Sequence, residues 1–212
     1  STFLSIFTNL APSISQQPAH WTGSPGSNVT ISVGVVGTPP FDLRWYRNDT
    51  YLTSTTNASL TFSNIQPNNA GNYVLLVTNS AGAVTSSVAT VKVVTVSFKG
   101  NGQTITNAIN AYAGPVTVEL INAFTNGLTF YTLDGSAPSF LATPYTGAFL
   151  LTQSTVVRAI GYSADFFQAG ESDPVTFQIL PTYGIAVSTP GGGSVALNPP
   201  SGPYLSNSVV NL

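Results

Sequence analysis

The stretch NNAGNYVLLVTNSAG, residues 68–82, decides the fold of the first half of the chain. Small polar residues and glycines of the kind that form turns stand at both of its ends. Between them Tyr73, Leu75 and Val77 occupy alternate positions, and this period of two is typical of a β-strand with one buried face. The stretch therefore predicts a strand that leads into a hairpin turn at residues 79–82.

Short strands of this kind continue along the whole chain. Turn signals recur about every 8 to 12 residues, and no window supports a long amphipathic helix. The predicted fold class is all-β. Only 6% of the 212 residues are charged while 42% are hydrophobic. The solubility of this protein must therefore depend on its uncharged polar residues Ser, Thr, Asn and Gln.

The composition argues against several function classes. The five Lys and Arg residues are scattered singly and the formal net charge is -2, so no basic stripe is present and nucleic acid is not expected as a partner. The absence of Cys excludes disulfides, thiolate metal sites and a cysteine nucleophile. The sequence contains no run of 18 or more apolar residues, so no membrane span is predicted. Because Met is absent even at position 1, we expect a mature or excised segment of an exported protein, extracellular or at the cell surface.

Four residues in the first half share a diagnostic spacing. Trp45 follows Val33 at the separation at which the tryptophan of an immunoglobulin sandwich follows its first cysteine. Leu75 follows Tyr73 at the separation at which the second cysteine follows the tyrosine. Residues 11–93 accordingly resemble the bacterial immunoglobulin-like domains of secreted and surface proteins. The resemblance implies that Val33 and Leu75 replace the usual cysteine pair and pack on Trp45, and that Tyr73 forms the tyrosine corner. Asn69 stands where the family often has Asp, which leaves an ion pair with Arg44 or Arg47 open.

A sandwich without the disulfide is energetically plausible. A bridge between positions 33 and 75 would close a loop of about 43 residues and contribute roughly 4 kcal/mol on the chain-entropy model. Burying two aliphatic side chains in its place contributes about 1.5 to 3 kcal/mol each. The two contributions are nearly equal, so we expect aliphatic packing alone to stabilise this domain.

The second half carries a different signature, YTLDGSAP at 131–138, PYTG at 144–147 and VRAIGY at 157–162. Asp134 and Gly135 supply a tight turn, because Gly accepts a positive φ and Asp bonds the backbone two residues on. The signature resembles the small β-sandwich at the carboxyl end of chitobiases and hexosaminidases. In that family catalysis belongs to a separate barrel domain, so the resemblance implies no glycosidase activity here.

Both ends of the chain are predicted to add β structure to these two domains. Residues 181–212 resemble the start of a β-repeat of bacterial surface proteins, and residues 1–10 are expected to form an apolar strand. The predicted organisation is thus an N-terminal strand or linker (1–10), an immunoglobulin-like domain (11–94), a chitobiase C-terminal-like sandwich (95–180) and a partial repeat (181–212). The fold is summarised as tandem immunoglobulin-like β-sandwiches with an incomplete third β unit. The apolar residues of the first strand are Phe3, Leu4, Ile6, Phe7 and Leu10.

Residues capable of acid–base or metal chemistry are few. The one histidine, His20, lies in a predicted turn, and no catalytic residue, resident metal or cofactor is predicted. The seven carboxylates are spread over both domains and form no evident pair. Asp165, Glu171 and Asp173 could ligate Ca²⁺ through loop oxygens, and the alternative is that they are ordinary solvated charges.

Two further sets of residues invite a functional interpretation. Asn28, Asn48 and Asn57 each begin an Asn-x-Ser/Thr sequon in the first domain, and chance sequons are the alternative in so Asn-rich a chain. Exposed rows of rings stack on sugars in β-sandwiches, and core or interface packing is the alternative role for such rings. The rings considered are Tyr51, Tyr112, Tyr162, Phe166 and Phe167.

Three hypotheses of function follow. The first is a non-catalytic structural module of an exported bacterial protein; in a sharper version the strand 1–10 of one copy fills the open edge of residues 181–212 in the next, giving a head-to-tail fibre. Both ends could instead be places where a longer chain was cut. The second is a carbohydrate-binding or spacer module beside a secreted glycan-active enzyme, and the third is an enzyme. The expected partners are accordingly other copies, neighbouring domains or a glycan.

Overall fold

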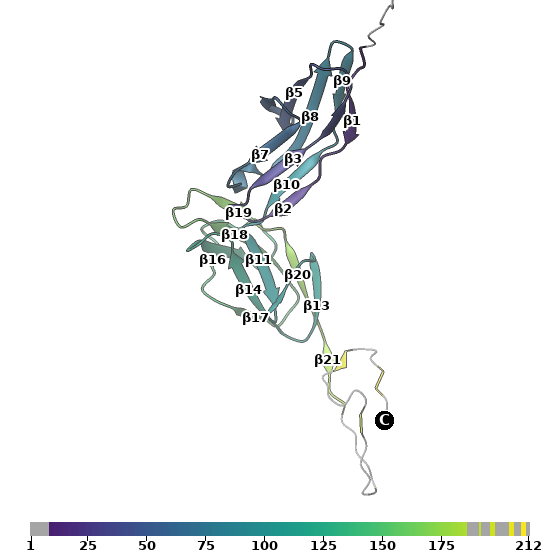
Figure 1. Cartoon of the computed structure of the whole chain (residues 1–212). Helices are drawn as coiled ribbons and strands as arrows, with labels where there is room; N and C mark the ends of the chain where they lie inside the picture. The colour runs from purple at the N-terminus through teal and green to yellow at the C-terminus, as the bar shows by residue number, and fades with distance from the viewer. Residues whose placement is uncertain (1–8, 186–190, 192–195, 198–203, 206–208, 211–212) are drawn as a thin grey trace, which may run out of the picture. The chain divides into compact units, whose positions relative to one another are not determined.

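The computed structural model describes residues 9–185, 191, 196–197, 204–205 and 209–210. The described chain is almost entirely β-structure (Figure 1), and its one helical element is the single 3₁₀ turn η1 (Pro67–Asn69). The prediction of an all-β fold is confirmed. The chain divides into two compact units, Ser1–Val94 and Thr95–Leu212.

The first unit is a sandwich of short antiparallel strands. Its larger sheet has the order β2-β10-β8-β5-β6, with β9 added to β8, and β10 runs parallel to β2. The pairs β3–β7 and β1–β4 make up the rest. The strands are β1 (Ser13–Gln16), β2 (Trp21–Gly23), β3 (Val29–Ser32), β4 (Gly34–Val36), β5 (Asp42–Arg47), β6 (Thr50–Thr55), β7 (Ser59–Phe62), β8 (Gly71–Asn79), β9 (Gly82–Thr85) and β10 (Ala89–Val93).

The quoted stretch forms η1, the strand β8 and the turn to β9. Tyr73, Leu75 and Val77 are fully buried, as their alternation predicts, and their intervening neighbours are only partly buried. The hairpin between β5 and β6 turns at Asn48 and Asp49, which both have positive φ. Asn and Asp tolerate this conformation, which a two-residue turn that matches the twist of the strands requires.

The second unit has its own two sheets. One has the order β12-β11-β14-β17, and the other has the order β13-β20-β18-β15-β16 with β19 added to β18. The strands are β11 (Val96–Gly100), β12 (Gln103–Thr104), β13 (Ile109–Ala113), β14 (Val116–Asn122), β15 (Leu128–Thr132), β16 (Thr143–Pro144), β17 (Phe149–Leu151), β18 (Thr155–Tyr162), β19 (Ala169–Glu171) and β20 (Val175–Leu180). An Asn101–Gly102 turn with positive φ at both residues joins β11 to β12.

The larger sheets of the two units share one topology. In each larger sheet the strand at one edge, β2 or β13, runs parallel to its neighbour, the last strand of that sheet, β10 or β20. The central strand, β8 or β18, pairs with that last strand and with a short hairpin strand, β9 or β19. Strands β2, β10, β8, β5 and β6 of the first unit thus correspond to β13, β20, β18, β15 and β16 of the second. This correspondence confirms the prediction of tandem immunoglobulin-like sandwiches.

Each unit is built round its own apolar core. In the first unit Trp45 and Leu75 are paired across β5 and β8 and have no solvent exposure. In the second unit Val118, Val157 and Phe177 are equally buried. The two cores are formed by the separate clusters Val29 to Val93 and Val96 to Phe177, so each sandwich has the packed interior of an independent domain.

The third β unit lies mostly outside the described residues. Within the part of residues 181–212 that the structure describes, β21 (Thr182–Tyr183) and β22 (Tyr204–Leu205) pair as antiparallel strands. At the other end Phe3, Leu4, Ile6 and Phe7 lie outside the described residues, and Leu10 is described.

Candidate functional site

The four residues expected at the centre of the first domain all lie in its core. Val33, Trp45, Tyr73 and Leu75 are buried within one apolar cluster. The Tyr73 hydroxyl donates a hydrogen bond to the Asn69 carbonyl at 2.5 Å, which is the geometry of a tyrosine corner. Burial raises the pKa of Tyr73, and the nearby Arg47 opposes that rise.

Asn69, Arg47 and Arg44 make other contacts in place of the ion pair that an aspartate at position 69 would allow. The Asn69 side chain accepts a hydrogen bond from the Gln66 backbone, and Arg47 donates to the Asn68 carbonyl at 2.6 Å. Arg44 pairs with Asp42 at 2.5 Å. The tyrosine corner is therefore stabilised by hydrogen bonds between neutral groups and by one from the Arg47 guanidinium, in place of a carboxylate.

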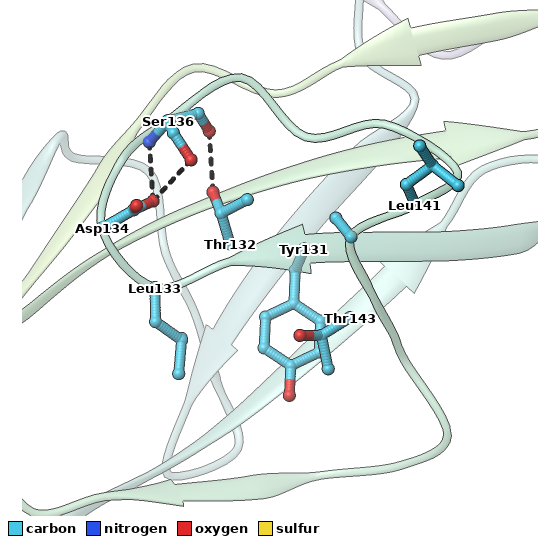
Figure 2. A pocket seen from close by; sticks show the side chains of 8 residues that line it. Tyr131, Thr132, Leu133, Asp134, Ser136, Leu141 and Thr143 are labelled. Atoms are coloured by element: carbon cyan, nitrogen blue, oxygen red, sulfur yellow. Dashed lines mark hydrogen bonds between the residues drawn. The ribbon is translucent and has the colours of Figure 1, made fainter.

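The Asp134–Gly135 turn follows directly on β15 in the second unit. Gly135 has a φ of 78°, and one carboxylate oxygen of Asp134 accepts both the backbone N–H of Ser136 at 3.0 Å and its hydroxyl at 2.6 Å. These hydrogen bonds hold the pKa of Asp134 below its ordinary value. The Thr132 hydroxyl donates to the Ser136 carbonyl at 2.7 Å and closes the turn, as Figure 2 shows.

An open pocket of about 450 Å³ lies beside this turn, between the end of β15 and the returning loop (Figure 2). Its lining combines a phenol, hydroxyls and one ionised carboxylate with apolar side chains. Asp134 is the one carboxylate among the described residues that line it. The lining residues are Tyr131, Thr132, Leu133, Asp134, Ser136, Leu141, Ala142 and Thr143.

The remaining residues with acid–base chemistry are tied to the scaffold at separate places. His20 is exposed and its Nδ1 accepts the Thr90 backbone N–H at 2.9 Å. Glu171 pairs with Arg158 at 2.5 Å. Asp165 accepts hydrogen bonds from the Ser163 hydroxyl and the Phe167 backbone, which lower its pKa.

The calcium interpretation of Asp165, Glu171 and Asp173 gains no support from these positions. Among the residues that the structure describes, no three His, Asp or Glu side chains come together as a metal site. The same part of the chain contains no helix long and apolar enough to cross a membrane.

The three sequon asparagines are exposed in the first unit, and each side-chain oxygen accepts a local hydrogen bond. Asn28 accepts from the Asn64 backbone, Asn48 from the Asn72 backbone and Asn57 from the Ser59 hydroxyl. The sequons are therefore placed on the surface, and their use stays a prediction.

The candidate sugar-stacking rings separate into three groups. Tyr112 stacks on Phe177 in the core of the second unit, and burial raises its pKa. Tyr51 lies in the first unit against Tyr46. Tyr162 and Phe166 lie together, with ring centroids 5.3 Å apart.

A further ring, which the sequence reasoning missed, adjoins the last group. The Phe130 ring meets that of Tyr162 at 5.9 Å, edge to face. Its neighbour Tyr131 stacks on Phe149 at the core, so alternation along β15 places Phe130 on the outer face of the sheet. The alternation could have found Phe130 in the sequence. We call Phe130, Tyr162, Phe166 and Phe167 the aromatic cluster.

Comparison with known families agrees with both resemblances. Residues 12–93 match the family model of the immunoglobulin I-set domain, and residues 107–165 match that of the chitobiase/beta-hexosaminidase C-terminal domain. The two domain types predicted from the sequence are thereby confirmed in the same order. The start of a surface-protein repeat at 181–212 stays a prediction. No curated protein matches the chain.

Similar solved structures are immunoglobulin domains. Titin domain M4 is 23% identical over 42% of this chain and 100% of that chain, with a TM-score of 0.38. The titin I-band fragment I67–I69 is 13% identical over 81% of this chain and 66% of that chain, with a TM-score of 0.39. Immunoglobulin domains 1–5 of Sidekick-1 are 15% identical over 81% of this chain and 38% of that chain, with a TM-score of 0.41.

Proposed function

We propose that this chain is a non-catalytic structural module of an exported bacterial protein, extracellular or at the cell surface. The observation that carries the proposal is that four of its titratable side chains are engaged in local hydrogen bonds or an ion pair. His20, Asp134 and Asp165 each accept backbone hydrogen bonds, and Glu171 is ion-paired. Each serves its own local structure, and in the part of the chain that the structure describes no two of these four side chains bond to one another.

The two domain types support the same role. Immunoglobulin-like and chitobiase C-terminal domains fit a non-catalytic accessory module, and both commonly occur in extracellular proteins. Function nevertheless resides in sites and not in folds, so the domain types alone would be weak support. The scattered titratable groups supply the independent argument.

Turnover assays test this proposal. The purified chain is incubated with chromogenic glycosides, carboxylic esters and phosphate esters, and product release is compared with a heat-unfolded sample of the same chain. We expect equal release from both samples. Release that only the folded chain produces, and that Asp134→Asn or His20→Gln abolishes, would overturn the non-catalytic proposal.

In a sharper form of the proposal, the module assembles into fibres by strand exchange. Strands β21 and β22 form a two-stranded sheet, and such a sheet gains stability from a further strand. The apolar residues Phe3 to Leu10 have the composition of that strand. Leu10 itself is bonded to Thr38 and Asn79 of its own unit, so the exchanged segment would lie before it.

Electron microscopy tests the fibre form. The whole chain and a variant lacking residues 1–8 are compared at equal concentration, since the shorter deletion keeps the Leu10 contacts. Filaments that vanish on deletion are the expected result. Monodisperse particles in both samples would remove fibre assembly and leave the structural role in place.

A second candidate function is a carbohydrate-binding or spacer module beside a glycan-active enzyme. The match of residues 107–165 to the chitobiase C-terminal family favours it by association. The aromatic cluster provides the chemistry that this role requires. Retention on insoluble polysaccharide separates this candidate from a purely structural module.

A further inference from the structure

The loop after β18 exposes two consecutive phenylalanines. Phe167 is 85% exposed and Phe166 is 50% exposed, in a chain with so little charge that every exposed ring lowers solubility. The Phe166 ring packs against the Tyr162 ring, which in turn packs against the Phe130 ring on the outer face of the sheet. The rings of Phe130, Tyr162 and Phe166 are therefore in contact outside both cores, and the exposed Phe167 follows Phe166 in the same loop.

The loop holds Phe166 in an unfavourable backbone conformation. Its φ is 62°, a region that bulky residues rarely adopt and that Gly or Asn would occupy at lower cost. The loop is nevertheless firmly closed, because Ser163 bonds Phe166 and Gln168, and Asp165 accepts the Phe167 N–H. A ring at this position thus costs folding free energy, and its exposed side contributes nothing to the core.

The size of the cluster argues against a stable protein partner. An aromatic side chain offers about 150 to 250 Å² of surface, so the exposed parts of Phe166 and Phe167 amount to roughly 250 Å². A standard protein interface needs about 800 Å² on each side. Even with the partly exposed Phe130 and Tyr162, the cluster fits a slender ligand better than a second copy of the chain.

The charges round the cluster favour a neutral ligand. Arg158 and Glu171 neutralise one another across β18 and β19, and Asp165 stands in the loop as an ionised carboxylate. A negatively charged ligand or an anionic membrane surface would be repelled by Asp165 and by the net charge of -2. A neutral sugar offers an apolar ring face for the aromatic side chains and hydroxyl donors for the carboxylates.

We propose that the aromatic cluster Phe130, Tyr162, Phe166 and Phe167 is a stacking platform for a neutral polysaccharide chain. The proposal rests on the second candidate function, glycan binding, and assigns its site. The open face of the cluster suits a polymer that lies across it, whereas a free monosaccharide would need walls on several sides.

A pull-down with variants tests the proposal. The full chain is mixed with insoluble chitin, cellulose, β-1,3-glucan and xylan, and the fraction left in solution is measured. The test variant is Phe166→Gly with Phe167→Ala, in which Gly suits the positive φ and keeps the loop closed. The matched control is Phe140→Ala, which removes a 61% exposed phenylalanine outside the cluster.

The expected result is retention of the wild type and of Phe140→Ala on at least one polysaccharide, with affinity at least about tenfold weaker for the double variant. Equal retention of all three would keep glycan binding but overturn this site. No retention of the wild type would overturn both the site and the second candidate function.

Two further measurements exclude the other occupants of such a surface. Flotation with phosphatidylcholine vesicles reports membrane binding, and sedimentation velocity reports dimers. Vesicle binding or a dimer that Phe166→Gly with Phe167→Ala abolishes, without polysaccharide retention, would overturn the proposal. Thermal unfolding of each variant verifies that the loop substitutions leave the second unit folded.

Discussion

At the scale of single residues, Tyr73 shows how the first sandwich is held without a disulfide or a carboxylate at its corner. Its ring packs edge to face on Phe62, with centroids 5.4 Å apart, and its hydroxyl is satisfied by the Asn69 carbonyl. One side chain thus joins the core to the segment that precedes β8. The Tyr73 hydroxyl is the part of this arrangement that can be removed without leaving a cavity.

Tyr73→Phe should lower the free energy of unfolding by about 1 kcal/mol, the usual net contribution of such a hydrogen bond. Urea unfolding followed by tryptophan fluorescence measures the change, because Trp45 lies in the same core. Tyr51→Phe is the control, since its hydroxyl bonds Ser54 at the surface and its loss should change little. Equal losses in the two variants would show that the corner does not stabilise the sandwich.

We expect the carboxylates of Asp134 and Asp165 to make the second unit sensitive to acid. Hydrogen bonds lower the pKa of both groups below the ordinary value of 3.8. Their contribution is therefore fully present above pH 3.8 and is lost as the pH falls through the lowered folded values. Melting temperatures between about pH 7 and pH 2 should fall less steeply for Asp134→Asn with Asp165→Asn than for the wild type. A steeper fall in the variant would contradict this assignment.

At the scale of elements, each of the two sandwiches has its own buried serine, which bonds the central strand from the segment just before the last strand. Ser86 exchanges hydrogen bonds with Leu75, its hydroxyl accepting the Leu75 N–H at 3.0 Å. Ser172 does the same with Ala159 at 2.9 Å. In each unit the serine precedes the last strand, β10 or β20, where it fills a gap in the backbone ladder.

Ser86→Ala and Ser172→Ala should each cost about 1 to 3 kcal/mol, because each leaves a buried backbone N–H without a partner. Calorimetry should show the loss in the melting of one unit alone, the first for Ser86 and the second for Ser172. The exposed neighbour Ser87 supplies the control, as Ser87→Ala should have almost no effect. A shift in both transitions from either serine variant would refute this local role.

The pair Val33 and Leu75 tests whether aliphatic packing can replace the bridge between the sheets. Val33→Cys with Leu75→Cys should be more stable oxidised than reduced by about 4 kcal/mol, because the bridge closes a loop of about 43 residues. Oxidised, it should come close to the wild type, because the lost aliphatic burial offsets the gain. Denaturant unfolding with and without reductant provides both comparisons. Failure of the thiols to pair would mean that the two side chains do not face each other as a cysteine pair would.

At the scale of the whole molecule, the sequence predicted what depends on local pattern. Alternation gave the strands, spacing placed Trp45 and Leu75 in the core, and Asp134–Gly135 formed the expected turn. Ser86 was not predicted, because a serine in a polar stretch reads as a surface residue and its burial depends on pairing with β8. The contact of Phe166 with Tyr162 was equally hidden, because it depends on a loop conformation that Phe rarely adopts.

The proposal that this chain is a structural module without catalytic activity concerns the whole molecule. The most direct measurement is mass spectrometry of soluble products after prolonged incubation of the full chain with the polysaccharide that retains it best, or with chitin if none does. We expect the same products as in a blank without protein. Oligosaccharides that accumulate in proportion to the amount of folded chain would contradict it.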